Sequence, residues 1–153
     1  MSPKLILPIG CAASGKTSWF TRFISPNVSF RISADEIRFE ILNYPKSGID
    51  FDPMIEPQVW AKVWQLFIAN TLVRNPIFLD CTNLTQARRM PFINCARAFG
   101  YEIQIVWFKK SLMTCLQQNA ARDRTLDESI IARQFVALQA PEGYEYDTLI
   151  KVA

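Results

Sequence analysis

The amino-acid sequence predicts an α/β fold with a mainly parallel sheet of five strands. The observation that supports this class is that five short apolar runs alternate with segments of helical period. Two further observations, the absence of an internal repeat in the 153 residues and an apolar half of the composition, indicate one globular domain. A chain of this length suits one domain with one hydrophobic core. We therefore expect a single domain over residues 1–153 and one main functional site.

The expected strands and helices follow one another in order. The apolar runs KLILPI, VSFRIS, PIFLD, EIQIVWF and DTLIKV predict strands at about residues 4–9, 28–33, 76–80, 102–108 and 147–152. The segments of helical period between them predict helices at about residues 16–25, 35–42, 56–72, 85–99, 111–121 and 127–139. The stretch 43–53 is rich in turn-forming residues, so we expect an exposed loop there, with Pro57 opening the next helix.

Composition and charge exclude several classes of function. The sequence has no histidine, which excludes Ser-His-Asp and Cys-His nucleophile systems and histidine-ligated metal sites. Its four cysteines form no CxxC pair, so we expect them to be reduced and the protein to be cytoplasmic. No stretch approaches the roughly 20 apolar residues that cross a bilayer, so no membrane contact is expected. The net charge of +3 combines basic and acidic segments, and the basic ones suit an anionic ligand.

A phosphate-binding loop is the strongest motif in the sequence. Residues 10–17 match GxxxxGK[ST] between a predicted strand and a predicted helix. The backbone N–H groups of such a loop point at phosphate oxygens, at the positive end of the helix dipole. We expect Lys16 to reach the β- and γ-phosphates of ATP and the Thr17 hydroxyl to ligate Mg²⁺, whereas a turn with no ligand is the alternative. The predicted nucleotide-binding residues are Gly10, Cys11, Ala12, Ala13, Ser14, Gly15, Lys16 and Thr17.

Two acidic residues are predicted at the same edge of the sheet as this loop. Asp35 follows the second strand and Asp80 ends the third, and ligands of open parallel sheets bind beyond the carboxyl ends of strands. Asp35 would accept a proton from an attacking hydroxyl, while Arg38, on the same helix face, would hold an anionic group of the acceptor. Asp80 would lie near Mg²⁺ or its water shell. The alternatives are a helix N-cap with an ion pair to Arg38, and a capping aspartate at a strand exit.

A lid is predicted at about residues 119–127, where one helix ends and another follows. Arg122 and Arg124 in this segment would close on the triphosphate and neutralise charge that develops during transfer; a solvated basic turn is the alternative. Thr82 and Asn83, after the third strand, would either cap the helix that contains Arg88 or contact the ligand.

An aromatic stripe runs along the helix predicted at residues 56–72. Trp60, Trp64, Phe67 and Ile68 share one helical face because they recur at i, i+4, i+7 and i+8. This spacing favours a stripe that packs on the core. A platform on which bases stack is the alternative.

Four sequence blocks together resemble a known family. GCAASGKT, SADEIR, LDCTNL and NAARDR occur in this order, and the sequence is similar to the kinase domain of the polynucleotide 5′-hydroxyl kinases, as in phage T4 polynucleotide kinase and the bacterial end-healing kinases. The resemblance covers nearly the whole chain and implies a P-loop kinase fold with strand order 2-3-1-4-5. It also implies ATP and Mg²⁺ as cofactors, a nucleic acid 5′-OH end as substrate, and a role in nucleic acid repair.

The same resemblance implies roles for individual residues. Asp35 corresponds to the general base, Arg38 to the arginine that contacts the acceptor phosphate, and Asp80 to the acid of the D-x-T-N motif. Arg122 corresponds to the lid arginine, with Arg124 as a helper. The chain departs from the family at Ala12 and Ala13, where Pro, Gly or Ser is common, and it lacks the phosphatase signature of larger members, which implies a stand-alone kinase.

Two other functions remain open from the sequence. A P-loop kinase of a small alcohol, such as a nucleoside, sugar or antibiotic, would use the same ATP machinery, and Arg38 would matter less if the acceptor has no phosphate. A nucleotide-binding switch or assembly ATPase would have no acceptor. The D-x-x-R pair at residues 35–38 favours a kinase over the switch.

Overall fold

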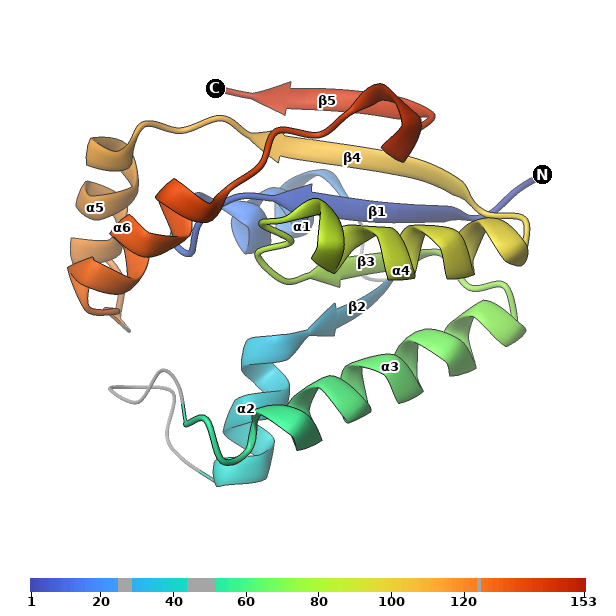
Figure 1. Ribbon diagram of the computed structural model, residues 1–153, viewed down its shortest axis with the longest axis horizontal. Helices are drawn as coiled ribbons and strands as arrows, with labels where there is room; N and C mark the ends of the chain where they lie inside the picture. The colour runs from blue at the N-terminus through green and yellow to red at the C-terminus, as the bar shows by residue number, and fades with distance from the viewer. Residues whose placement is uncertain (25–28, 44–51, 124) are drawn as a thin grey trace.

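The computed structural model describes residues 1–24, 29–43, 52–123 and 125–153. Within them, five strands form one parallel sheet in the order β2-β3-β1-β4-β5 (Figure 1). The strands are β1 (Lys4–Ile9), β2 (Phe30–Ser33), β3 (Ile77–Asp80), β4 (Glu102–Phe108) and β5 (Thr148–Val152). The predicted fold class and strand order are therefore confirmed.

The helices alternate with the strands as predicted. They are α1 (Lys16–Phe23), α2 (Ala34–Leu42), α3 (Glu56–Leu72), α4 (Gln86–Ala98), α5 (Leu112–Ala120) and α6 (Glu128–Ala137). Their ends differ from the predicted ones by no more than two residues. A short 3-10 helix, η1 (Gly143–Glu145), was not predicted, and most of the loop expected at 43–53 lies outside the described residues. No helix in the described ranges combines the length and apolar character needed to span a membrane.

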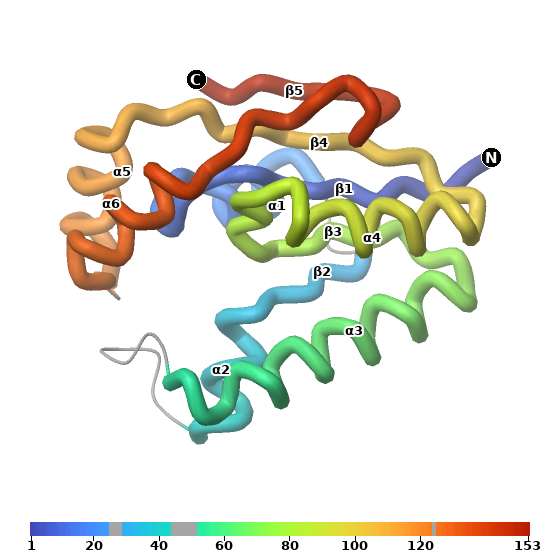
Figure 2. Tube along the Cα trace, in the orientation of Figure 1, coloured from blue at the N-terminus to red at the C-terminus, as the bar shows by residue number. Residues whose placement is uncertain are grey.

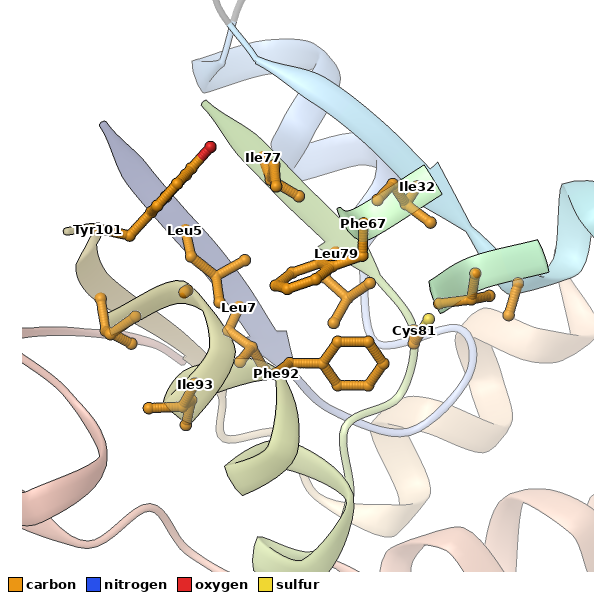
Figure 3. Close-up of a cluster of buried hydrophobic side chains, with 14 of the residues drawn as sticks. Leu5, Leu7, Ile32, Phe67, Ile77, Leu79, Cys81, Phe92, Ile93 and Tyr101 are labelled. Atoms are coloured by element: carbon orange, nitrogen blue, oxygen red, sulfur yellow. The ribbon is translucent and has the colours of Figure 1, made fainter. Parts of the chain in front are cut away.

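Helices cover both faces of the sheet. Phe67 of α3 and Phe92 and Ile93 of α4 are buried against one face (Figure 3), and the rings of Trp64 and Phe92 stack with centroids 4.1 Å apart. Phe20 of α1 is buried in a separate cluster on the other face. Helices α5 and α6 lie beyond the carboxyl ends of the strands, and the chain reverses direction between them (Figure 2). The faces of the sheet are therefore covered, and a ligand can approach at the carboxyl edge, beside α5 and α6.

Two neighbouring strands in the middle of the sheet, β1 and β3, are joined at its carboxyl edge by the side chain of Asn83. β1 pairs with β4 along its whole length but with β3 only at Leu5 and Ile6. Pro8 lies in this central strand and has no N–H to donate to a neighbour. Beyond it, the side-chain amide of Asn83 donates to the carbonyl oxygens of Pro8 at 2.7 Å and Leu79 at 3.1 Å. Asn83 thus joins the carboxyl ends of β1 and β3.

A buried ion pair fastens the C-terminal part of the chain to α4. Arg89 and Glu145 are both fully buried, and Arg89 Nε donates to Glu145 Oε1 at 2.6 Å. Arg89 Nη1 also donates to the carbonyl oxygen of Asn83 at 2.8 Å. Removing one member of such a pair typically destabilises a protein by about 3–5 kcal/mol because a buried charge is left uncompensated. The buried Arg89 is therefore a structural residue.

Candidate active site

One large cavity lies at the carboxyl edge of the sheet. Its volume is about 1270 Å³, and it is lined by segments that follow β1, β2 and β3 together with parts of α3, α5 and α6. Lys16, Asp35, Asp80 and Arg122 all line it. The structure thus gathers side chains that are far apart in the sequence at the place where ligands of open parallel sheets bind.

The backbone of the phosphate loop has the shape that its glycines allow. A Cβ atom on Gly10 would collide with the hydroxyl of Ser14, and Gly15 has a φ of 102°. Ala13 also lies in the left-handed region, with a φ of 66°. A residue with a Cβ adopts that region at a cost of about 1–2 kcal/mol. The alanine at position 13 therefore keeps the loop conformation but strains it.

Lys16 begins α1, and its side chain turns back onto this loop. Its ammonium donates to the carbonyl oxygens of Gly10 at 3.0 Å and Cys11 at 2.7 Å. Burial lowers the pKa of Lys16 from its ordinary value, while the nearby carboxylates of Asp80 and Asp35 act in the opposite direction. The ammonium is therefore a buried charge held by neutral carbonyl groups, and a phosphate oxygen would be a stronger partner.

Thr17 and Asp80 meet beside the loop, as the motif predicts for an ion site. The Thr17 hydroxyl donates to Asp80 Oδ2 at 2.9 Å. A hydroxyl and a carboxylate are hard oxygen ligands of the type that Mg²⁺ takes, so these residues fit that ion. Arg31 of β2 was not predicted here: its Nε donates to the same Oδ2 atom at 2.8 Å. A guanidinium therefore lies at the position where a cation would approach the carboxylate.

The pairing of β2 with β3 explains the position of Arg31. Arg31 is the register partner of Phe78, and Ser33 is the partner of Asp80. Side chains two residues apart on a strand share a face, so Arg31 and Asp80 both lie on the face covered by α1. The sequence signal that could have identified Arg31 as a site residue was an arginine two residues before the end of a short apolar strand.

Asp35 and Arg38 form the ion pair expected on one face of α2. Arg38 Nη1 donates to Asp35 Oδ1 at 2.8 Å. Ser33 caps the helix by accepting a hydrogen bond from the N–H of Glu36 at 3.2 Å, which fixes the first turn and with it Asp35. The side chain of Asp35 is 46% exposed and lines the cavity, so its carboxylate is accessible from there.

Glu56, at the start of α3, is the second partner of Arg38 and was missed by the sequence analysis. Arg38 Nε and Nη2 donate to its two carboxylate oxygens at 2.9 and 2.8 Å. Burial alone would lower the pKa of Arg38, but the hydrogen bonds and charges of Glu56 and Asp35 outweigh it, so that the pKa is raised. The guanidinium is thus clamped between two carboxylates that belong to different helices.

The predicted lid segment packs against the phosphate loop. Asn119 holds the turn between α5 and α6, because its amide donates to the carbonyl oxygen of Leu126 at 2.8 Å and its Oδ1 accepts from the N–H of Leu126 at 3.0 Å. The N–H of Ala12 donates to Gln134 Oε1 of α6 at 2.8 Å. Arg122 lines the cavity from this turn, whereas the predicted helper Arg124 lies outside the described residues.

Comparison with known proteins identifies the family. The model of the AAA_33 family, described as an AAA domain, matches residues 5–141. The chain belongs to this family. It also shares its fold with a gluconokinase from Sinorhizobium meliloti 1021, at 18% identity and a TM-score of 0.61. This match covers 99% of this chain and 83% of that chain. For the APS kinase CysC of Mycobacterium tuberculosis, identity is 15%, the TM-score 0.58 and the coverage 98% and 88%.

A chain of the Pnkp1/Rnl/Hen1 RNA repair complex has the same fold. It is 19% identical with a TM-score of 0.67, and the match covers 90% of this chain and 44% of that chain. This AAA_33 chain therefore spans less than half the length of the repair protein that it matches. The P-loop kinase fold is common to all three structures.

The residues after β3 in this AAA_33 chain differ from the sequence expectation. Thr85, and neither Thr82 nor Asn83, caps α4, since its side chain accepts from the N–H of Arg88 at 3.2 Å. Of the two roles considered for Thr82 and Asn83, the helix cap is therefore excluded, because Asn83 instead bridges β1 and β3 before the helix begins. Thr82 lines the cavity.

The aromatic stripe of α3 divides between the core and the site. Phe67 is fully buried and Trp64 packs beside it, as predicted for a core stripe. Ile68 is 37% exposed. Trp60 lines the cavity, and the guanidinium carbon of Arg88 lies 4.5 Å from the centroid of its ring. One end of the stripe therefore belongs to the site.

Proposed function

We propose that this protein transfers the γ-phosphate of ATP to the 5′-hydroxyl end of DNA or RNA. The observation that carries this proposal is the position of Asp35. Its partly exposed carboxylate lies in the same cavity as the phosphate loop and is oriented by Arg38. A nucleotide switch needs no such group, whereas a kinase needs a carboxylate that accepts the proton of the attacking hydroxyl.

The cavity provides the parts that phosphate transfer requires. The N–H groups of the loop and Lys16 would hold the phosphates of ATP, and Thr17 and Asp80 would hold Mg²⁺, which neutralises charge on the phosphates when it is bound. The acceptor oxygen forms a bond to the γ-phosphorus as the bond to the ADP oxygen breaks, and Asp35 takes the acceptor proton. Arg122, on the lid, would stabilise charge on the transferring group.

The polynucleotide acceptor is supported by the sequence blocks and by one structural relative. The D-x-x-R pair and the LDCTNL block match the polynucleotide 5′-hydroxyl kinases, and one similar structure comes from an RNA repair complex. We propose on the same grounds that the protein acts in nucleic acid repair, and its four cysteines without a CxxC pair support a location in the cytoplasm.

A kinase of a small alcohol is the second candidate, and Glu56 favours it. Because Glu56 takes two N–H groups of Arg38, that arginine has less capacity for a phosphate on the acceptor. The full-length likeness to a gluconokinase and to a sugar kinase from Janibacter sp. HTCC2649, of which 83% and 86% are covered, also supports this candidate. The two candidates share the donor half of the site.

The acceptor can be identified directly. Purified protein is incubated with γ-labelled ATP, Mg²⁺ and a 5′-hydroxyl oligonucleotide, beside the same oligonucleotide with a 5′-phosphate and a panel of nucleosides and sugars. Label on the 5′-hydroxyl strand alone is the expected result. Label only on a nucleoside or sugar would overturn the polynucleotide acceptor in favour of the second candidate, and ATP binding without any transfer would overturn the kinase.

The role of Asp35 can be tested with a substitution of similar shape. Asp35→Asn should lower the transfer rate by about 10²–10⁴-fold, the usual contribution of a general base, and should leave the affinity for ATP unchanged. Glu40→Gln, an exposed change on the same helix, is the control and should have no effect. An Asp35→Asn enzyme with the wild-type rate would contradict the mechanism.

A further inference from the structure

Side chains from α2, α3 and α4 line the cavity together with Asp35. Asp35 contacts Arg38, and Arg38 contacts Glu56. Trp60 follows Glu56 by one turn of α3, so the two side chains share a helical face, and Arg88 of α4 lies over the Trp60 ring. All five residues line the same cavity. We refer to Asp35, Arg38, Glu56, Trp60 and Arg88 as the acceptor wall.

Within the acceptor wall, the carboxylates near Asp35 outnumber the cations. Asp35 and Glu56 supply two carboxylates, and Arg38 supplies one guanidinium that is hydrogen-bonded to both. The charge of Arg38 is therefore already engaged by the carboxylates of Asp35 and Glu56, which leaves it less able to attract an acceptor phosphate. A phosphorylated acceptor therefore needs another cation further along the wall.

Arg88 is the cation in that position. Its side chain is exposed, and among the residues that the structure describes its guanidinium makes no ion pair; it lies over the Trp60 ring. Trp60 itself packs against the buried core cluster, so the ring is a fixed platform. A guanidinium above an aromatic face keeps N–H donors for a planar, bidentate contact with phosphate oxygens.

We propose that Arg88, positioned by Trp60, binds a phosphate group of the acceptor while Asp35 faces the reacting hydroxyl. This inference rests on the proposed kinase function and deepens it, because it defines the acceptor as an alcohol that also carries a phosphate. A phosphodiester of a polynucleotide and the phosphate of a small phosphorylated alcohol share that chemistry. Arg38 then orients Asp35, and Arg88 binds the acceptor anion.

Binding measurements with Arg88→Gln test this assignment without depending on transfer. The affinity of a fluorescent 5′-hydroxyl oligonucleotide is measured by anisotropy over a range of salt concentrations, in the presence of a non-hydrolysable ATP analogue. Loss of one phosphate contact should weaken binding about 10-fold and lower the slope of log affinity against log salt by about 0.7. Arg97→Gln, an exposed change on the same helix outside the cavity, is the matched control and should alter neither quantity.

Kinetic measurements with different acceptors separate the sources of the phosphate. For an acceptor that carries a phosphate, Arg88→Gln should raise KM about 10-fold with kcat nearly unchanged, and for a nucleoside without phosphate it should change neither. If only a phosphorylated small alcohol shows this effect, Arg88 retains its role while the polynucleotide acceptor fails. If transfer occurs but Arg88→Gln behaves like Arg97→Gln with every acceptor, the Arg88 assignment is overturned and the kinase stands.

The positioning role of Trp60 has its own test. Trp60→Phe keeps an aromatic face under Arg88 and should keep KM for the phosphorylated acceptor within about twofold, whereas Trp60→Leu should raise it towards the Arg88→Gln value. Thermal unfolding of both variants shows whether either change disturbs the core. A folded Trp60→Leu protein with unchanged KM would overturn the positioning role.

Discussion

The two walls of the cavity are constructed in different ways. The donor wall, formed by the phosphate loop with Lys16, Thr17 and Asp80, consists of one short stretch of backbone and one strand end, and Lys16 and Asp80 are buried. The acceptor wall takes its side chains from three helices, α2, α3 and α4, and on it Asp35 is partly exposed and Arg88 is exposed. The donor wall is local and the acceptor wall is assembled by the fold.

This difference separates the part of the site that is common to a fold from the part that selects a substrate. Backbone N–H groups and one lysine bind phosphates in the same way whatever the acceptor is, so the donor wall can stay constant. An acceptor wall made of side chains on separate helices can change one contact at a time. Substitutions in the donor wall should therefore change the transfer rate by the same factor for every acceptor. Substitutions in the acceptor wall should change it by different factors for different acceptors.

Lys16→Met should have the largest effect and should be independent of the acceptor. Removing a cation aimed at the transferring phosphate is expected to lower kcat/KM by on the order of 10²–10³-fold with every acceptor tested. Lys62→Met, an exposed change on α3, is the control. A loss of kcat/KM that differed between acceptors would contradict the distinction between the two walls.

Glu56→Gln should have an intermediate effect, confined to the acceptor wall. Glu56 and Arg38 are 15% and 17% exposed, so loss of their charged hydrogen bonds should lower the free energy of unfolding by about 1–2 kcal/mol. Denaturant unfolding measures this change, with the exposed Glu128→Gln in the first turn of α6 as the control. Nucleotide affinity should stay at the wild-type value, and a change in it would show that the walls are coupled.

Arg31→Gln should have the smallest effect and should appear in the response to Mg²⁺. Arg31 donates to the Asp80 carboxylate that fits the ion, so removing its charge should lower the Mg²⁺ concentration for half-maximal nucleotide binding by about threefold to tenfold. Nucleotide affinity titrated against Mg²⁺ measures this shift, with the exposed Arg22→Gln on α1 as the control. Weaker nucleotide binding at every Mg²⁺ concentration would instead indicate that Arg31 contacts the nucleotide.

The same difference explains which parts of the site the sequence could predict. Lys16 and Thr17 were predicted because their neighbours in sequence are also their neighbours in space, and Asp80 because it ends an apolar strand. Glu56 and the contact of Trp60 with Arg88 were missed, since they depend on how α3 packs beside α2 and α4, and no local pattern records that packing. The fold was predictable from periodicity, while the strand order came from resemblance to a family.

The hydrogen bond between Gln134 and the phosphate loop links the loop to the packing of α6. The side-chain oxygen of Gln134 accepts from the N–H of Ala12 at 2.8 Å, so a phosphate oxygen that takes this N–H must displace it. Nucleotide occupancy and docking of α6 then oppose one another, and such a linkage is reciprocal. The packing of α6 on the loop would weaken nucleotide binding by the same factor by which bound nucleotide weakens that packing. The free energy of nucleotide binding would thus be set in part by the side chain of Gln134, which lies on a helix outside the phosphate loop.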